Sequence, residues 1–326
     1  MVMINEISMN NNLTLSYNKF GDPKSVIELM EKQLQPLSSS MIRVRMILSP
    51  INPSDLIPIT GAYSHRIQLP SVVGYEGVGK VVDAHGKYKA LIDSRVLLIK
   101  SEGTWQHYVD CHPTKIIKVP GYINNEVACR SYINPLSAYS MLMRWKPYGK
   151  VILVTGGGSE CSQILGQWAL MMGAKKVISV YRSSEHIEVL KRLGFTPISE
   201  SELLALSDAA KISDLIFDAV GGSIGSLILD KIQTNSTFVM YGLLSGHPLN
   251  INKEKQKVVN RFHLRDVMGA LSDSDIAKQF EKIWLLLSNT NIHSIKYFNI
   301  NEWQVALDYF LKSGRLLKPV FKLSEL

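Results

Sequence analysis

Three consecutive glycines and the segments around them are the first part of this chain whose residue types and spacing suggest chemistry. Gly156–Gly158 follow an apolar, β-branched stretch at 150–155, which predicts a buried strand. A helical pattern comes next and ends at Gly173, and 177–181 predicts a second strand. A strand, a glycine turn, a helix and a strand within about 30 residues form a βαβ unit. Backbone amides and a helix N-terminus meet at such a turn, where they suit the pyrophosphate of a dinucleotide.

The polar residues of this turn depart from the G-x-G-x-x-G pattern. A register that starts at Gly157 places Ser159 and Ser162 where the second and third glycines belong, with Glu160 between them. A carboxylate there suits the helix dipole but repels a pyrophosphate. The alternative is that Ser159 caps the helix and Glu160 is a solvated acid of its first turn. On the dinucleotide hypothesis, the cofactor-binding residues of the turn are Gly157, Gly158, Ser159 and Ser162.

The end of the second strand indicates which dinucleotide this would be. Enzymes that prefer NAD usually place Asp or Glu there, to accept hydrogen bonds from the ribose 2′-hydroxyl. This chain has Tyr181, Arg182, Ser183 and Ser184 instead, and its first acid is Glu185. Arginine and hydroxyl groups suit a 2′-phosphate, so we predict NADPH as the cofactor, with Tyr181 and Arg182 beside its phosphate.

The composition is that of a globular enzyme large enough for two domains. Of the 326 residues, 46% are hydrophobic and 20% are charged. No apolar run approaches the roughly 18 residues of a membrane span. The first 15 residues carry an acid and no basic residue, which fits neither a signal peptide nor a transit peptide. Three cysteines without close pairing fit a reduced compartment. These features predict a cytosolic protein without a membrane partner.

The net charge of +8 is dispersed along the chain. Its densest basic window, 253–261, contains Glu254 and no interleaved aromatic residue. This favours a solvated helix face over a nucleic-acid surface, so we expect no nucleic-acid partner.

Several short motifs follow one another along the chain. They are Ile51-Asn52-Pro53-Ser54-Asp55, Gly61 to Tyr63, the pattern L-P-x-x-x-G-x-E-G-V-G at 69–79, Gly103 to Trp105, Asn134 to Tyr139, Ala219 to Gly222, and Tyr241-Gly242. Together with the βαβ unit, these motifs make the chain resemble the zinc-free branch of the medium-chain dehydrogenase/reductases. Within that branch it is similar to the mitochondrial-type 2-enoyl thioester reductases and their bacterial relatives, and the likeness runs from Tyr17 to Phe321.

The resemblance implies an α/β fold in which a Rossmann domain with a doubly wound parallel sheet is inserted into a β-rich, GroES-like catalytic domain. We place the first part of the catalytic domain at 1–125, the NADP-binding domain at 126–265 and the return segment at 266–326. The resemblance also implies a homodimer formed through the nucleotide domains. Besides the βαβ unit, the patterns predict strands at 13–18, 26–31, 42–48, 80–84, 95–99, 103–109, 116–119, 215–220, 237–241 and 318–322, and helices at 275–288 and 302–313.

Tyr63, in the G-x-Y motif, is implied by the resemblance to protonate the substrate. In these reductases a hydride from the nicotinamide adds to the β-carbon of an α,β-unsaturated thioester, and an acid then delivers a proton to the α-carbon. A phenol, whose ordinary pKa is near 10, is protonated at pH 7. Asn52, which we include among the catalytic residues, and Asp55 are expected to shape the loop that presents Tyr63. The alternatives are turn caps for Asn52 and Asp55 and a packed core side chain for Tyr63.

The resemblance assigns further residues to the cofactor site, namely Asn134, Tyr241 and Gly242. Trp105 is expected to wall the substrate pocket, with a place in the core as the alternative. Tyr75 stands where some of these reductases have Asn. Met268 lies in the segment 266–269, where mitochondrial-type enzymes have an aromatic segment that contacts the nicotinamide and the acyl site. Tyr75, Trp105 and Met268 are therefore the predicted pocket residues.

We predict no metal site. Zinc-dependent members of the superfamily carry Cys-His early and His-Glu further on, where this chain has Asn52-Pro53 and Tyr75-Glu76. The local cluster of ligand types is His107, Cys111 and His112, and on a strand His112 points away from the other two. A structural zinc site normally needs four converging ligands.

The predicted function is NADPH-dependent reduction of an activated carbon–carbon double bond. The foremost substrate is a trans-2-enoyl thioester of coenzyme A or of acyl carrier protein. One alternative is a quinone or enone oxidoreductase with the same fold and cofactor. Another is a catalytically lapsed scaffold or partner protein, which Glu160 and Ser162 suggest.

Overall fold

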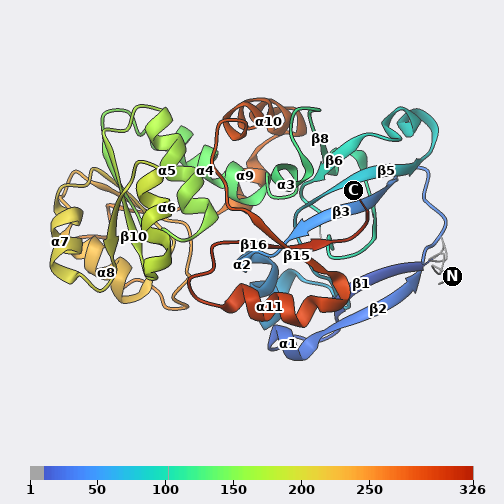
Figure 1. Cartoon of the computed structure of the whole chain (residues 1–326), viewed down its shortest axis with the longest axis horizontal. Coiled ribbons are helices and arrows are strands. Elements are labelled where there is room, and N and C mark those ends of the chain that lie inside the picture. Colours follow the sequence, from blue (N-terminus) through green and yellow to red (C-terminus); the bar gives the residue numbers. More distant parts are fainter. Residues whose placement is uncertain (1–10, 102, 326) are drawn as a thin grey trace. The chain divides into compact units, whose positions relative to one another are not determined.

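The structure, a computed structural model, describes residues 11–101 and 103–325, and the chain divides into two compact units (Figure 1). Unit 2 consists of Ile133–Ser294 and Ser313–Leu316. Unit 1 takes the described residues up to Tyr132, then Ile295–Lys312 and the residues from Leu317 onward. The chain therefore leaves unit 1 once, returns to it, and makes one short excursion back to unit 2.

The sheet of unit 2 is parallel throughout, and its order is β11-β10-β9-β12-β13-β14. In chain order this is 3-2-1-4-5-6, the order of a doubly wound Rossmann sheet, so the predicted fold class is confirmed. Side chains such as Leu153, Ile216 and Phe238 are fully buried, because helices cover both faces of such a sheet. The strands are β9 (Val151–Val154), β10 (Lys176–Tyr181), β11 (Thr196–Ser199), β12 (Leu215–Asp218), β13 (Thr237–Met240) and β14 (Val259–Arg261).

The helices of unit 2 connect these strands and extend beyond the last of them. They are α4 (Ile133–Arg144), α5 (Glu160–Met171), η5 (Ser184–His186), α6 (Ile187–Arg192), α7 (Leu203–Lys211), α8 (Gly222–Lys231), α9 (Leu264–Ala270) and α10 (Asp273–Leu287). Helices α7 and α8 lie side by side (Figure 1). Both α9 and α10 pack against α4.

Unit 1 is built on two sheets. The larger has the order β15-β16-β3-β5-β6-β8, with β7 paired to β3, and the smaller has the order β2-β1-β4. Among the described strands of this unit, β15 and β16 pair in parallel and the other pairs are antiparallel. The strands are β1 (Asn11–Tyr17), β2 (Ile27–Gln33), β3 (Ile42–Pro50), β4 (Ser71–Val72), β5 (Gly77–Ala84), β6 (Arg95–Leu98), β7 (Tyr108–Cys111), β8 (Ile116–Lys118), β15 (Ile295–Asn299) and β16 (Lys318–Lys322).

Short helical segments connect the strands of unit 1, and one longer helix covers its core. The segments are α1 (Pro23–Val26), α2 (Pro53–Leu56), η1 (Ile57–Thr60), η2 (Ser64–Arg66), η3 (Gly86–Leu91), η4 (Pro113–Lys115), α3 (Asn125–Ala128) and η6 (Ile300–Glu302). The longer helix is α11 (Trp303–Leu311). Its buried residues Trp303, Leu307 and Phe310 recur at helical spacing and join the core cluster that contains Leu15 and Phe321.

Two boundaries differ from those drawn on the sequence. The units change at Ile133 and Ile295, whereas we placed the changes at 126 and 266. Helix α3 stays with unit 1, where Arg95 Nη1 donates to Asn125 Oδ1 over 3.0 Å. Helices α9 and α10 stay with unit 2 because they pack against α4. These attachments are tertiary contacts, which strand and helix patterns do not record.

The expected strand at 103–109 is wrong over most of its length. Only Tyr108–Cys111 forms a strand, β7. Gly103 has a φ of +88°, and the Trp105 N–H donates to the Val73 carbonyl while its own carbonyl accepts from the Leu15 N–H. The segment therefore crosses beside the smaller sheet before β7 begins. The pattern also missed β15, which pairs with the correctly predicted β16.

Across the described part of the chain, helices are too short or too polar to cross a bilayer.

Candidate active site

The glycine turn of unit 2 is packed so closely that side chains are excluded from it. A Cβ added at Gly157 would lie 2.4 Å from Ser179 Oγ, and one added at Gly158 would lie 2.5 Å from His186 Nε2. Gly156 has a φ of +64°, which favours glycine. The turn therefore brings bare backbone to the N-terminus of α5, as the close approach of a pyrophosphate requires.

Ser159 and Ser162 hold the first turn of α5. Ser159 is the N-cap, and its Oγ accepts from the Ser162 N–H over 3.3 Å. The Ser162 hydroxyl is fully buried; it donates to the Thr155 carbonyl over 2.7 Å and lies 2.8 Å from the Tyr241 hydroxyl. Ser162 has one proton, which goes to Thr155, so Tyr241 donates to Ser162. Burial raises the pKa of Tyr241 well above its ordinary value, which keeps that hydroxyl protonated.

Glu160 is not the solvated acid that the alternative expected. Its side chain is buried, and Oε2 accepts from Asn134 Nδ2 over 3.1 Å. Asn134 belongs to the first turn of α4, so the carboxylate is engaged on the α4 side of the turn. The structure thus brings Asn134 to the glycine turn, together with the serines and Tyr241.

The ends of β9, β12 and β13 form one hydrogen-bonded network beside the turn. Asp218 accepts from Thr155 Oγ1 over 2.6 Å and from the backbone N–H groups of Val220 and Gly221. Burial raises the pKa of this carboxyl. A Cβ on Gly242 would lie 2.6 Å from the Ala219 carbonyl oxygen, so the backbone after β13 lies directly against the end of β12.

The end of β10 carries Tyr181 and the exposed Arg182, as predicted, and the structure adds Arg315. Arg182 Nη2 donates to Ser313 Oγ over 3.4 Å. Burial lowers the pKa of the buried His186; the charge of Glu185 raises this pKa and that of Arg315 lowers it. A Cβ added at Gly314 would lie 2.7 Å from Ser183 Oγ, so the backbone next to Arg315 lies against the turn after β10. Sequence reasoning missed Arg315, which is far away in the chain. The available signal was Gly314, whose φ of +72° marks a turn directly after α11.

In unit 1 the predicted residue Asn52 belongs to a buried polar cluster. Asn52 Nδ2 donates to Glu76 Oε1 over 2.7 Å, and Asn52 Oδ1 accepts from Lys318 Nζ over 2.5 Å. Asp55 accepts from the Asn52 N–H over 2.7 Å and from the Tyr75 N–H over 3.0 Å. Asn52, Asp55 and Glu76 are each 1% exposed, and Lys318 is 7% exposed. Both ends of the Asn52 amide are therefore occupied by protein partners, which favours a loop-shaping role over contact with substrate.

Tyr63 lies at the start of η2, half-buried, in a loop that begins with Gly61 at a φ of +91°. The guanidinium carbon of Arg66 lies 3.9 Å from the centre of the Tyr63 ring. This stacking is typical of a cation–π contact, and it places a positive group on the face of the predicted proton donor. Tyr75 is also half-buried.

Trp105 belongs to the core of unit 1, the alternative that the sequence left open. Its side chain is fully buried, its ring centre lies 4.9 Å from that of Phe321, and its Nε1 donates to the Pro50 carbonyl over 3.2 Å. Met268 is buried as well, in α9 of unit 2. Trp105 and Met268 are therefore both packed inside their own units, and neither position indicates the wall of a pocket.

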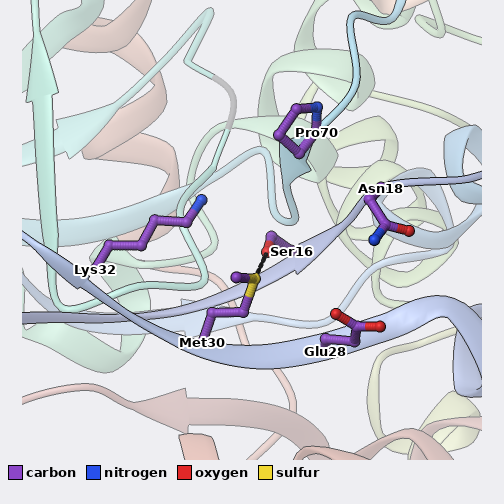
Figure 2. A pocket seen from close by; sticks show the side chains of 6 residues that line it. All are labelled: Ser16, Asn18, Glu28, Met30, Lys32 and Pro70. Atoms are coloured by element: carbon purple, nitrogen blue, oxygen red, sulfur yellow. Dashed lines mark hydrogen bonds between the residues drawn. The ribbon is translucent and has the colours of Figure 1, made fainter.

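A separate pocket of about 230 Å³ lies on the smaller sheet of unit 1 (Figure 2). It is lined by Ser16, Asn18, Glu28, Met30, Lys32 and Pro70. Figure 2 shows Ser16 and Met30 in contact across the β1–β2 hairpin, where Ser16 Oγ donates to Met30 Sδ over 3.3 Å. None of the predicted site residues lines it, so this pocket is not the site that the motifs indicate.

Among the described side chains, no three His, Cys, Asp or Glu residues lie together so that they could hold a metal ion. Cys111 faces the core of unit 1, where burial raises the pKa of its thiol to about 12.

The residues around the glycine turn fit a phosphorylated dinucleotide. The turn offers backbone that a Cβ would obstruct, at a helix N-terminus. Two buried polar atoms beside it, Ser179 Oγ and His186 Nδ1, have no hydrogen-bond partner among the described residues. Arg182 and Arg315 supply positive charge at the end of β10. NADPH would be held by these groups, by the first turn of α5 and by the Tyr241–Gly242 segment.

The chain is similar over most of its length to known reductases. It is 31% identical over 327 residues to the mitochondrial enoyl-[acyl-carrier-protein] reductase of Arabidopsis thaliana, covering 93% of this chain and 86% of that protein. It is 30% identical over 249 residues to the human protein of the same name, covering 72% of this chain and 66% of that protein. The crystal structure of a candidate NADPH:quinone reductase from Bacillus thuringiensis matches with a TM-score of 0.88 and 31% identity, over 96% of this chain and 99% of that one. No protein-family model matches.

This comparison corrects the predicted location. The relatives in Arabidopsis thaliana, Homo sapiens and Dictyostelium discoideum are mitochondrial proteins, so the expectation of a cytosolic protein is wrong. That expectation used the composition of residues 1–15, of which 1–10 lie outside the described residues.

The glycine turn, the Rossmann strand order and the aligned relatives agree with one another. The chain belongs to the family of the mitochondrial enoyl-[acyl-carrier-protein] reductases, in the zinc-free branch of the medium-chain dehydrogenase/reductase superfamily.

Proposed function

We propose that this protein reduces the carbon–carbon double bond of a trans-2-enoyl thioester, with NADPH as the cofactor. The observation that carries the proposal is the 31% identity with the Arabidopsis enoyl-[acyl-carrier-protein] reductase over 93% of the chain. The structure supports it through a glycine turn at a helix N-terminus, with two arginines at the end of β10. When bound, NADPH supplies the hydride that adds to the β-carbon.

Tyr63 is the proposed acid of this reaction. The reduction leaves a negative charge that is shared between the α-carbon and the thioester oxygen, and the Tyr63 hydroxyl delivers a proton to the α-carbon. The products are the saturated thioester and a phenolate, which regains its proton from water. The Arg66 guanidinium on the ring places positive charge beside the negative charge that develops in this step.

The decisive experiment follows the oxidation of NADPH by the purified protein with crotonyl-CoA. We expect turnover by the wild type. The Tyr63→Phe variant is expected to lower kcat by roughly 10²–10⁴-fold, the usual contribution of a positioned acid, and to bind NADPH as the wild type does. Tyr122→Phe is the matched control, because Tyr122 is in unit 1 and 62% exposed. Equal kcat for Tyr63→Phe and Tyr122→Phe would remove Tyr63 from the mechanism.

A quinone is the second candidate substrate. The match to the Bacillus thuringiensis NADPH:quinone reductase candidate, at a TM-score of 0.88 and 31% identity, favours it specifically. Oxidation of NADPH by a quinone, with crotonyl-CoA left unchanged, would decide for the quinone. Turnover of crotonyl-CoA alone would decide for the thioester. Failure to bind NADPH would point to a protein that has lost catalysis.

We further propose that acyl carrier protein delivers the substrate and that the protein is a homodimer. The carrier appears in the name of the aligned relatives. Strand β14 lies at the edge of the unit 2 sheet, and an edge strand offers unpaired backbone groups to a second copy. Light scattering tests the dimer, and a comparison of kcat/KM for crotonyl groups on coenzyme A and on acyl carrier protein tests the carrier.

A further inference from the structure

The buried charge cluster of unit 1, formed by Asn52, Asp55, Glu76 and Lys318, joins segments that are far apart in the sequence. Asp55 accepts from the N–H groups of Asn52 and Tyr75, and thereby links the start of α2 to the segment before β5. Glu76 accepts from Asn52 Nδ2 over 2.7 Å and from the Tyr132 N–H over 3.1 Å. Asp55 therefore binds the backbone of two segments, and Glu76 links the Asn52 side chain to the backbone at Tyr132.

Lys318 is the cation of this cluster, and it comes from the return segment of the chain. Strand β16 pairs with β3 so that Val320 lies opposite Pro50, and the Ile51 N–H donates to the Pro319 carbonyl over 3.1 Å. Continued by two residues, this register carries Lys318 to Asn52, the second residue after β3. Its Nζ donates to Asn52 Oδ1 over 2.5 Å, and its side chain is almost fully buried.

The segment from Asn52 to Tyr63 depends on its anchors. It contains α2 and η1, each four residues long, and helical segments of that length are not stable by themselves. Its middle is held where the Gly21 N–H donates to the Ile59 carbonyl over 2.9 Å, and Ile59 is fully buried. Its start is held by the buried charge cluster, through Asn52 and Asp55.

We propose that Lys318 is a positioning residue for the proton donor: by fixing the Asn52 amide, its buried ammonium sets the start of the segment that carries Tyr63. The expected effect on kcat rests on the proposed function, whereas the expected effect on the position of the segment does not. Both sides of the Asn52 amide must be fixed at once, Oδ1 by Lys318 and Nδ2 by Glu76. Loss of the ammonium removes the donor to Asn52 Oδ1 and takes a positive charge away from the buried carboxylates.

The pH dependence of kcat distinguishes a positioning role of Lys318 from a role in stability alone, because a role in stability alone would not shift it. The pKa of Asp55 is raised to about 7. Burial is the main cause and the charge of Glu76 also raises the pKa, whereas the N–H groups of Asn52 and Tyr75 and the charge of Lys318 lower it. Asp55 accepts both N–H groups fully only as a carboxylate. We therefore expect kcat to fall below a pH of about 7, and removal of the Lys318 charge to move this fall to higher pH.

The test compares Lys318→Met with Lys322→Met. Lys322 is the matched control, because it lies on the same strand but its side chain is 32% exposed and pairs with Glu325 over 3.1 Å. In Lys318→Met we expect kcat to fall about tenfold or more, its acid limb to move to higher pH, and NADPH affinity to stay unchanged. Hydrogen exchange is expected to become faster across 52–63 and to stay unchanged in α8, which belongs to unit 2.

A double variant, Lys318→Met with Glu76→Gln, covers the case in which the single variant does not fold. It removes one negative and one positive charge together, so it is expected to recover thermal stability and still show a low kcat and fast exchange across 52–63. Wild-type kcat in the double variant would overturn the proposal, because Lys318 would then serve charge balance alone. Unchanged kcat, acid limb and exchange in Lys318→Met would overturn it as well.

Failure of the proposed function has a different signature. The wild type would then leave both crotonyl-CoA and quinones unreduced. Hydrogen exchange across 52–63 would still decide whether Lys318 holds this segment, because that readout needs no substrate.

Discussion

Gly157→Ala tests the geometry of the glycine turn most directly. The added Cβ would lie 2.4 Å from Ser179 Oγ and 3.1 Å from the Val180 carbonyl oxygen. Rotation of the Ser179 side chain would relieve only the first contact, since the second is to the backbone of β10. Ordinary contact begins at 3.4 Å, so the contact with Ser179 Oγ alone would require a shift of about 1 Å. Once Ser179 has rotated, the contact with the Val180 carbonyl still requires the turn to move about 0.3 Å away from β10.

This shift is expected to lower the free energy of unfolding. Overpacking of a buried site costs roughly 1–3 kcal/mol of the free energy of unfolding. In a folding unit of about 150–250 residues, each 1 kcal/mol lowers Tm by roughly 2–4 °C, so a loss of several degrees is expected. The same displacement moves the phosphate-binding backbone, and we expect NADPH affinity to fall about tenfold or more, which is about 1.4 kcal/mol.

The assay combines thermal denaturation with fluorescence titration of NADPH. Gly121→Ala is the matched control, because Gly121 lies in unit 1 and a Cβ there meets nothing within 4 Å. Alanine restricts the unfolded chain more than glycine does, so the control is expected to keep or slightly raise Tm and to leave NADPH affinity unchanged. Wild-type Tm and affinity in Gly157→Ala would refute the inference that this backbone lies against β10 and holds the cofactor.

Further predictions concern the cofactor, the buried hydroxyl network and the effect of pH. Arg182→Ala is expected to weaken NADPH binding about tenfold and leave NADH binding unchanged in parallel titrations, because only NADPH carries the 2′-phosphate; equal losses for both would contradict that role. Ser162→Ala leaves the Tyr241 hydroxyl without the Ser162 acceptor, so urea denaturation should show that the free energy of unfolding falls by about 1–3 kcal/mol. The losses of Ser162→Ala and Tyr241→Phe, added together, should exceed the loss in the double variant, because the two side chains share one hydrogen bond. For Asp55, a folded-state pKa raised from 3.8 to about 7 means that the folded chain keeps a proton that the unfolded chain has released, so stability falls as pH rises through this window. Asp55→Asn should flatten that fall in thermal denaturation at stepped pH, and an unchanged slope would show that Asp55 is not its source.

The βαβ unit was determined by the sequence alone, because its signals are local. A β-branched run, three glycines and a helical period each constrain a few neighbouring residues, and β9, α5 and β10 lie where these signals place them. The order of motifs along the chain likewise sufficed to indicate the family, which the aligned relatives then showed.

The environment of individual polar residues was decided only by the tertiary structure. Glu160 looked like a surface acid because its neighbours in the sequence are polar, yet Asn134 from α4 covers it. Trp105 was expected to wall the pocket, with the core as the alternative, and Phe321 from the last strand packs on it in the core. A sequence pattern records the period of one element and not which distant element will cover it.

The same limit explains the two residues that sequence reasoning missed. Arg315 and Lys318 stand three positions apart in a short segment near the end of the chain, but Ser313–Leu316 belongs to unit 2 and Lys318 to unit 1. The backbone next to Arg315 lies against the turn after β10, and the Lys318 ammonium donates to Asn52. The residue types of this segment, basic and apolar, are those of an ordinary surface turn followed by a strand. Only the path of the folded chain, which runs past both units here, gives each charge its partners, because the energy of a buried charge depends on what surrounds it.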